Sequence, residues 1–304
     1  MTEPRALTKG RAFAGCTVAL VTPFRDGELD EPALRQLVDW HVAQGTDAVS
    51  PVGTTGEAPT LSHAEHERVI DTVLDQAAGR VKVIAGTGSN STAEAVRLTR
   101  YAAKAGAAAA LIVAPYYNRP MQEGLYAHFA KVAESVDLPI ILYNIPGRTG
   151  RNMEPDTIER LARIESIVAI KEAAGSLDQV SEIVARTNLT VLSGDDSLTL
   201  PMLAVGGEGV ISVAANLVPG DVQSLVRAFQ VGDVAKARAL HFKLFTLCRE
   251  LLGLAVNPIP LKAALALLGR GNGELRLPLT PLDERGLLKL RATLEAYGLT
   301  LAST

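Results

Sequence analysis

The chain is poor in cysteine, in aromatic residues and in charge of one sign. Of its 304 residues, 2 are cysteine, 1 is tryptophan and 4% are aromatic, and the formal net charge is -3. A charge this small gives no electrostatic reason to expect nucleic acid or a membrane surface as a partner. Cys16 and Cys248 lie far apart in the sequence, which argues against a disulfide framework and fits a reducing, cytoplasmic location. We expect each to be a small buried hydrophobic side chain.

Long hydrophobic runs are also absent. The longest apolar stretch, around residues 107–115, is far shorter than the ~18 residues that a membrane span requires. Residues 1–12 are polar and basic, and no apolar segment follows them, so we expect an N-terminal extension and no signal peptide.

Several common site motifs are missing as well. The sequence has no complete dinucleotide-binding glycine loop, no P-loop and no serine nucleophile elbow. The histidines do not have the spacing of the His-Glu-x-x-His zinc motif, and the cysteines do not have ligand spacing. We therefore predict no metal site.

What the chain does have is a steady alternation of strand-length apolar runs and amphipathic helix patterns. The runs are nearly continuous in apolar character, which is typical of parallel strands covered on both faces. We predict eight strands, at Thr17–Thr22, Ala48–Pro51, Val81–Ala85, Ala109–Ala114, Pro139–Tyr143, Ile167–Ile170, Leu189–Leu192 and Val210–Val213. The helices that follow them are predicted at Glu31–Gln44, Ser62–Gly79, Ser91–Ala105, Met121–Ser135, Glu154–Ile164, Leu177–Thr187, Leu198–Val205 and Pro219–Gln230. Eight such units favour an α/β fold of the (β/α)8 TIM-barrel type over a doubly wound sheet.

Two helix starts and the end of the chain add detail. Ser62 with Glu65, and Ser91 with Glu94, each have the spacing of a capping box. Beyond the last unit we predict helices only, at Val234–Leu252, Pro258–Leu268 and Pro281–Tyr297. We expect a catalytic barrel over residues 13–231 and a C-terminal module of three helices over residues 232–304, whose default role is packing or oligomer contact.

Lys171 is the most informative residue, because it ends the sixth apolar run. The active site of a barrel enzyme lies where its strands end, so this lysine is expected at the mouth. Partial desolvation lowers the pKa of an amine, and a neutral amine can attack a ketone to form a Schiff base. By position alone, however, a lysine at a strand end is more often an ordinary surface charge.

Other strand ends supply groups that suit carbonyl chemistry on a small anion. Gly53-Thr54-Thr55-Gly56-Glu57 follows the second strand and offers hydroxyls and closely approaching backbone amides. Three of the six tyrosines lie at strand ends, among them Tyr117 and Tyr143. Arg148, in a Gly/Pro-rich turn, has the bidentate fork that a carboxylate requires.

These segments together resemble one protein family. Six motifs in one colinear order are similar to those of the dihydrodipicolinate synthase / N-acetylneuraminate lyase family: Gly53-Thr54-Thr55-Gly56-Glu57, Tyr116-Tyr117-Asn118, Leu142-Tyr143-Asn144, Arg148-Thr149-Gly150, Ile170-Lys171-Glu172 and Asn257-Pro258-Ile259-Pro260. The resemblance runs from about Gly15 to Leu282. The paired threonines and Arg148 favour the synthase branch, since sialic acid lyases usually carry Ser-Thr in that loop and lack this arginine.

The resemblance implies a synthase that condenses pyruvate with L-aspartate 4-semialdehyde, the first committed step of lysine biosynthesis by the diaminopimelate route, without a cofactor. It implies that Lys171 forms an imine with pyruvate and that Tyr143, Thr54 and a Tyr117 from a neighbouring subunit relay protons. Thr55, Ile211, Gly194 and Arg148 are implied as substrate-binding residues, with Arg148 on the aldehyde substrate's carboxylate. The expected assembly is a homotetramer, a dimer of dimers.

The resemblance also implies a site for lysine as an inhibitor at a dimer interface. Its matching positions are Ala58, Pro59, His63, His66, Asn90, Glu94 and Tyr116. Two of these depart from what such a site prefers: Ala58 replaces a common serine, and Pro59 lacks a backbone donor.

Two other functions remain open from the sequence. A sibling aldolase, acting on a sialic acid or a 2-keto-3-deoxy sugar acid, would use the same Lys171 imine without Arg148 in this role. A catalytically idle small-molecule sensor could share the scaffold, although a sensor has no need of Thr54, Tyr117 and Tyr143 as a proton relay.

Overall fold

The fold is a closed barrel of parallel strands surrounded by helices, in a computed structural model that describes residues 7–302. The strand order around the barrel is β1-β10-β9-β8-β7-β6-β5-β4, and every barrel pair is parallel. The barrel strands are β1 (Gly15–Ala19), β4 (Ala48–Ser50), β5 (Lys82–Gly86), β6 (Ala109–Val113), β7 (Ile140–Asn144), β8 (Ile167–Glu172), β9 (Thr190–Ser193) and β10 (Gly209–Ser212). The predicted (β/α)8 barrel is confirmed.

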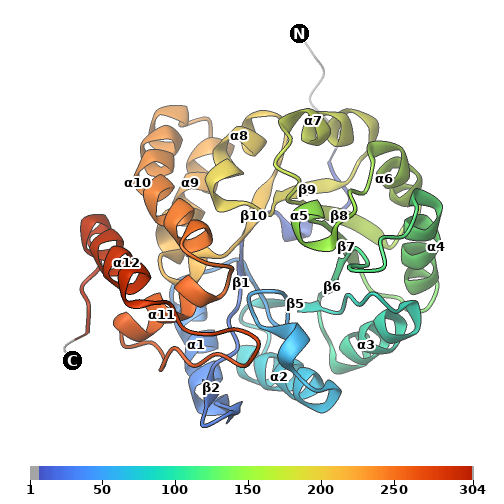
Figure 1. The fold of residues 1–304 in the computed structure, drawn as a ribbon. Helices are drawn as coiled ribbons and strands as arrows, with labels where there is room; N and C mark the ends of the chain where they lie inside the picture. Colours follow the sequence, from blue (N-terminus) through green and yellow to red (C-terminus); the bar gives the residue numbers. More distant parts are fainter. Residues whose placement is uncertain (1–6, 303–304) are drawn as a thin grey trace.

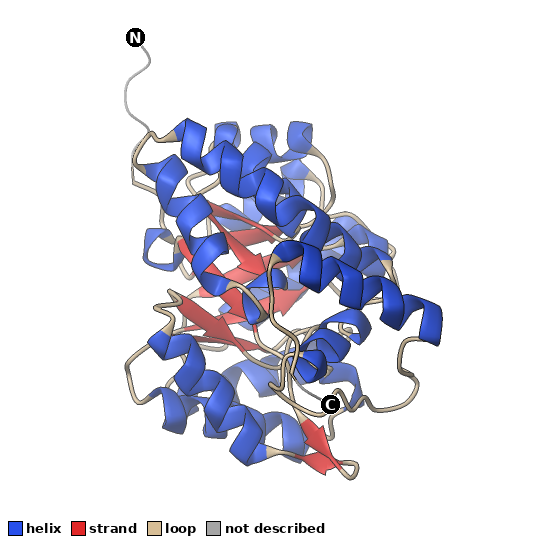
Figure 2. Ribbon diagram, turned by 90° about the vertical axis from the view of Figure 1, so that its left-hand side faces the viewer, coloured by secondary structure: helices blue, strands red, loops and turns tan. Residues whose placement is uncertain are grey.

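Helices form the outer ring around the barrel strands (Figure 1), and in the side view helices lie above and below these strands (Figure 2). They are α1 (Glu31–Ala43), α2 (His63–Ala77), α3 (Thr92–Ala105), α4 (Gln122–Ala133), α6 (Pro155–Ala162), α7 (Leu177–Arg186), α8 (Thr199–Ala204) and α9 (Pro219–Gln230). The predicted bounds of these strands and helices agree with the observed ones to within three residues. Agreement is this close because covered strands and amphipathic helices differ in their hydrophobic period.

Short elements that the sequence did not predict lie in the connections. A two-stranded antiparallel hairpin, β2 (Phe24–Arg25) with β3 (Glu28–Leu29), projects from the barrel at the bottom of Figure 2. The helix α5 (Pro146–Thr149) follows β7 directly and carries Arg148. Single 3-10 turns occur at Arg11–Phe13, Ala58–Thr60, Asp196–Leu198 and Ala214–Asn216.

One predicted capping box is confirmed and the other is wrong. At the start of α2, the Ser62 side chain accepts from the Glu65 amide and the Glu65 carboxylate accepts from the Ser62 amide. At the start of α3, Ser91 makes no such cap. Glu94 instead accepts from the Ser89 hydroxyl and pairs with His63, 2.8 Å away on α2. Glu94 therefore bonds to Ser89 and His63, outside α3, in place of the expected capping bond with Ser91.

The C-terminal helices are α10 (Val234–Gly253), α11 (Ile259–Leu267) and α12 (Glu284–Tyr297), on one side of the barrel (Figure 1). α10 packs beside α9, and α11 and α12 pack against α10 and against each other. Their apolar residues join the layer between β1 and the outer helices, for example Leu247, Leu261 and Leu290. Of the predicted N-terminal extension at 1–12, residues 1–6 lie outside the described part of the chain.

Side chains that point inward fill the barrel below the mouth. This interior cluster includes Phe13, Ile84, Leu111, Ile141, Ala169, Leu192 and Ile211. Both cysteines are buried and free, as predicted. Within residues 7–302, no helix combines the length and the apolar character that crossing a membrane requires.

Candidate active site

Lys171 and Tyr143 are neighbours at the mouth because of strand register. They pair across β8 and β7, and their inward direction continues that of Ala169 and Ile141 two residues earlier. Both side chains are only 6% exposed, and the Lys171 Nζ lies 4.1 Å from the centre of the Tyr143 ring. An amine and a phenol therefore share a largely desolvated site.

The next residue on each strand points outward and forms a buried polar network. The Glu172 carboxylate accepts from the Asn144 amide at 3.1 Å, from the Gln179 amide at 3.0 Å and from the Ala174 backbone at 2.7 Å. Burial raises the pKa of Glu172, and these donors act against that rise. Because Asn144 and Glu172 are cross-strand partners, their bonds hold the register that brings Tyr143 to Lys171.

The loop after β4, residues 53–57, brings two threonines to the same mouth. We call it the hydroxyl loop. The Glu57 amide donates to the Thr54 carbonyl at 3.1 Å, and the Ala58 amide donates to the Gly53 carbonyl at 3.2 Å. Thr55 is buried, and its Oγ1 accepts from the Asn257 side chain at 2.9 Å.

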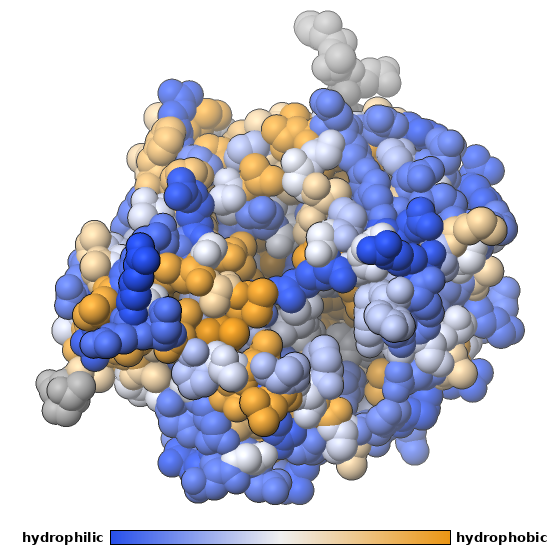
Figure 3. All heavy atoms as spheres, viewed as in Figure 1, coloured by the Kyte–Doolittle hydropathy of each residue, from blue (hydrophilic) through white to orange (hydrophobic). Residues whose placement is uncertain are grey.

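A cavity of about 560 Å³ opens at this mouth, in the hollowed centre of the face shown in Figure 3. Its walls include Thr54, Thr55, Tyr143, Arg148, Lys171 and Gly194. A side chain at position 194 would obstruct it, since a Cβ there would lie 3.1 Å from Lys171 Cε and 2.7 Å from Ala173 Cβ. Arg148 is exposed, and its Nη2 donates to the Asn257 carbonyl at 3.2 Å. Six predicted residues thus converge on one cavity.

Two predicted residues do not line this cavity. Ile211 is buried in the barrel interior, and the cavity is instead lined by Val213, which follows the end of β10. Tyr117 is 90% exposed and is not among the residues that line the cavity. Its φ of 73° is in the left-handed region, which is uncommon for a bulky residue and is concentrated at functional positions.

A second cavity, of about 420 Å³, adjoins the first. Thr54, Tyr143 and Arg148 border both. Its lining includes six of the seven predicted regulatory residues, Ala58, Pro59, His63, His66, Glu94 and Tyr116. Asn90 does not line it, and its carbonyl accepts from the Asn118 side chain at 2.9 Å.

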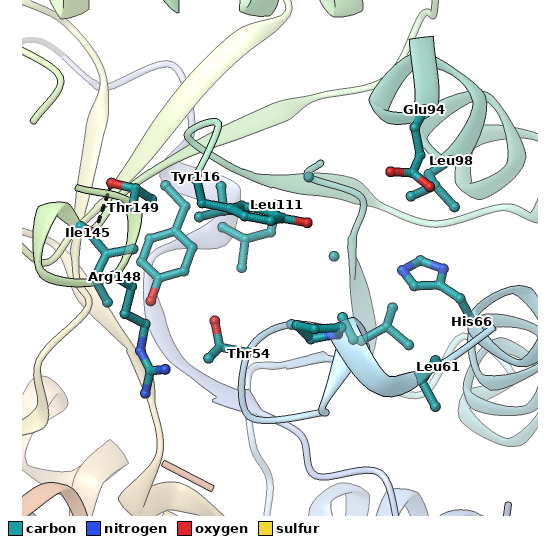
Figure 4. A pocket seen from close by; sticks show the side chains of 18 of the residues that line it. Thr54, Leu61, His66, Glu94, Leu98, Leu111, Tyr116, Ile145, Arg148 and Thr149 are labelled. Atoms are coloured by element: carbon teal, nitrogen blue, oxygen red, sulfur yellow. Dashed lines mark hydrogen bonds between the residues drawn. The ribbon is translucent and has the colours of Figure 1, made fainter. Parts of the chain in front are cut away.

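The two ends of the second cavity carry different polar groups. Figure 4 shows His66 and Glu94 facing each other at one end, and Thr54 and Arg148 at the other. Burial lowers the pKa of His66 to about 4, so its imidazole is neutral near neutral pH. Burial, and then the nearby Glu94 carboxylate, raise the pKa of Tyr116. The Glu94 carboxylate could pair with the ammonium group of a ligand bound in this cavity.

The predicted residues that line the first cavity supply an amine, a phenol, two hydroxyls and a guanidinium. Among residues 7–302, no cluster of three or more histidine, cysteine, aspartate or glutamate side chains is arranged to hold a metal ion. The arrangement suits an amine nucleophile acting on a small carbonyl compound, with phenol and hydroxyl groups for proton transfer.

Comparison with known proteins agrees with this chemistry. The model of the Dihydrodipicolinate synthetase family matches residues 12–297. The chain belongs to this family. It is 54% identical over 290 residues to the 4-hydroxy-tetrahydrodipicolinate synthase of Syntrophobacter fumaroxidans, a match that covers 94% of this chain and 99% of the relative.

Solved structures of Dihydrodipicolinate synthetase family members have the same fold. The crystal structure of dihydrodipicolinate synthase from Aquifex aeolicus has a TM-score of 0.94 and 52% identity, covering 96% of this chain and all of that one (100%). The enzyme from Cyanidioschyzon merolae, solved with lysine bound, has a TM-score of 0.92 and 42% identity, covering 95% of this chain and 99% of that one.

Three residues at the site were not assigned a role from the sequence. Asn257 bridges Thr55 and Arg148, although the sequence marked it only as part of a family motif. Glu57 closes the hydroxyl loop, and Lys262 of α11 reaches it from the C-terminal helices. Lys262 had no local signal, because it lies in an apolar helix far along the chain.

Proposed function

We propose that this protein condenses pyruvate with L-aspartate 4-semialdehyde, the reaction of 4-hydroxy-tetrahydrodipicolinate synthases and the first committed step of lysine biosynthesis by the diaminopimelate route. Its family is one of Schiff-base-forming lyases. The observation that carries the proposal is the buried Lys171 amine lying 4.1 Å from the Tyr143 ring at the mouth of the barrel.

In the first half of the proposed reaction, the neutral Lys171 amine attacks C2 of pyruvate. The ketone oxygen takes up protons and leaves as water, which gives an imine, and loss of a methyl proton then gives an enamine. Backbone amides around Thr55 and at the end of β10, near Ile211, would hold the pyruvate carboxylate, with Gly194 leaving room beside the lysine. Tyr143 would carry the protons.

A phenol with an ordinary pKa near ~10 needs help to exchange protons near neutral pH. Thr54, which shares the cavity with Tyr143, would be the first member of a relay. Tyr117 would be the second and would come from a neighbouring subunit, since its own side chain is 90% exposed. We therefore propose an assembly in which each subunit contributes its Tyr117 to the active site of a neighbour. This assembly would be a homotetramer built as a dimer of dimers. With two free, buried cysteines, a cytoplasmic location is part of the same proposal.

In the second half, the enamine carbon adds to the aldehyde carbon of aspartate semialdehyde. Arg148 would hold that substrate's carboxylate with its guanidinium fork. The product amine then closes the ring onto C2 and displaces Lys171, which regenerates the free amine. The proposed steps need no cofactor.

We also propose that lysine inhibits the enzyme by binding in the second cavity. Glu94 offers the ligand's ammonium group a carboxylate, His66 faces Glu94 across the same end of the cavity, and Tyr116 adds a hydroxyl to the lining. The cavity borders Thr54, Tyr143 and Arg148, so a bound ligand would lie close to the catalytic groups. The lysine-bound relative from Cyanidioschyzon merolae supports this proposal.

Borohydride reduction in the presence of pyruvate tests the imine. Reduction should attach a stable three-carbon adduct to Lys171, located by peptide mass spectrometry, and the K171R variant should remain unlabelled. Lys82, at the start of β5 on the opposite end of the barrel, is an internal control that should stay unmodified. Absence of label on Lys171 would refute the proposed chemistry.

A further inference from the structure

A buried ion pair joins the hydroxyl loop to the C-terminal helices. The Lys262 Nζ of α11 contacts the Glu57 carboxylate, and the two side chains are only 4% and 0% exposed. Glu57 comes directly after Thr54, Thr55 and Gly56. The contact therefore connects a catalytic loop of the barrel to a helix some two hundred residues later in the chain.

Each partner of the pair is held by further groups. Lys262 Nζ also donates to the Glu274 carbonyl at 2.8 Å and lies 4.1 Å from the centre of the Phe24 ring. The second oxygen of Glu57 accepts from the Arg276 backbone amide at 3.2 Å. The Arg276 side chain lies 4.3 Å from the same Phe24 ring and pairs with Glu65 of α2 at 2.6 Å. Both charges thus have several partners, which a buried charge requires.

The residue that forms the ion pair with Lys262, Glu57, also has a strained backbone. Glu57 has a φ of 52°, in the left-handed region that a residue other than glycine rarely adopts. Such a conformation persists only where the surroundings determine it. Here Thr22 donates to the Gly56 carbonyl at 2.7 Å, and Asn257 donates to Thr55 Oγ1 at 2.9 Å. The Thr60 hydroxyl donates to the Glu57 carbonyl at 3.0 Å. The other partners of the loop, Asn257, Lys262 and Arg276, all come from residues 257–276.

We propose that Glu57 and Lys262 are positioning residues, whose ion pair anchors the hydroxyl loop to α11 and so holds Thr54 in place for proton transfer with Tyr143. The inference rests on the proposed function, because it concerns the same relay. A buried ion pair adds little net stability compared with an apolar contact of the same shape. Its two directed charges nevertheless fix the position of the loop, and proton transfer is sensitive to displacements of about 1 Å.

The test compares proton transfer with imine formation on the same samples. Exchange of the pyruvate methyl protons with deuterated water, followed by NMR, reports enamine formation and requires the relay. Borohydride trapping reports how much Lys171 forms the imine. In E57Q and in K262M, we expect exchange per trapped imine to fall roughly 10- to 100-fold, while trapping at saturating pyruvate stays near that of the unaltered protein.

Two further variants separate positioning from stability. Each single variant leaves one buried charge unpaired and should lower the unfolding temperature, whereas E57Q/K262M removes both charges and should recover most of it. We expect the double variant to keep the slow exchange. The matched control is K289M, which breaks the pair of Lys289 on α12 with Glu250 on α10 and does not touch the loop; its exchange should equal that of the unaltered protein.

Each outcome bears on a distinct claim. If the unaltered protein neither traps pyruvate nor exchanges its methyl protons, the proposed function itself fails. If the unaltered protein exchanges and E57Q exchanges equally fast per imine, the positioning role is wrong. Recovery of both stability and exchange in E57Q/K262M would likewise overturn it, because the pair would then serve the fold alone.

Discussion

Replacing Arg148 with alanine should separate the two substrates of the proposed reaction. Arg148 borders the cavity from α5, and its Nη2 is already directed by the Asn257 carbonyl at 3.2 Å. The Lys171 amine and the Tyr143 ring come from β8 and β7 and contact each other directly. We therefore expect R148A to impair use of aspartate semialdehyde and to leave imine formation with pyruvate intact.

The size of the effect follows from the contacts that are lost. A hydrogen bond to a charged group contributes about 1.5–3 kcal/mol, and a guanidinium fork makes two with a carboxylate. Since Arg148 is exposed, water competes for both hydrogen bonds. Each bond should therefore contribute about 1.5 kcal/mol, the lower end of that range. The loss of about 3 kcal/mol corresponds to roughly a hundredfold decrease in kcat/KM for the aldehyde.

The assay is initial rate against aspartate semialdehyde at saturating pyruvate, with borohydride trapping on the same samples. R148K, which keeps the charge without the fork, should give an intermediate kcat/KM. An R148A enzyme with unchanged kcat/KM for the aldehyde would contradict the assignment and would favour a sibling aldolase. Loss of trapping in R148A would show that Arg148 acts on the pyruvate step instead.

Three other predictions concern the assembly, the second cavity and pH. Y117F should lower kcat by roughly 10- to 100-fold, and mixed oligomers of Y117F with K171A should regain part of the activity, which they would not do if Tyr117 acted within its own subunit. Lysine should inhibit the enzyme in rate assays, and E94A should need at least roughly tenfold more lysine for the same inhibition, because the ammonium loses its carboxylate; insensitivity of the unaltered enzyme would refute the site. Burial lowers the pKa of His41 from 6.5 to about 3, so the stability that its neutral form contributes is complete above pH 6.5 and is lost as the pH falls toward 3. In thermal unfolding between about pH 7 and pH 4, H41Q should therefore lose less stability than the unaltered protein, and equal losses would contradict this.

Much of the architecture could be predicted because its signals are local. The run Ile167–Ile170 reads as a covered strand from its own residues, and the Ser62–Glu65 capping box is complete within one turn. Lys171 could be placed at the barrel mouth because strand ends of a parallel barrel meet on one face. The short helix α5 was missed since four residues with a proline and a glycine have no periodicity to detect.

The errors and omissions concern contacts between distant segments. The capping box at Ser91 has the right spacing, yet Glu94 pairs with His63 of the neighbouring helix, which no local rule contains. Tyr117 and Tyr143 looked alike as strand-end tyrosines, but one is 90% exposed and the other 6%. Tyr143 lies within β7 and points into the barrel, whereas Tyr117 lies in the loop after β6.

The sequence by itself therefore determined the order of strands and helices, the family and the residue types at the strand ends, since each of these depends on near neighbours in the chain. Only the tertiary structure decided which of them meet. Closing the barrel brings Lys171 over Tyr143, and the packing of α11 brings Asn257 to Thr55, 202 residues away, and Lys262 to Glu57. These contacts have no local signal because their free energy comes from burial and from charges paired across the fold.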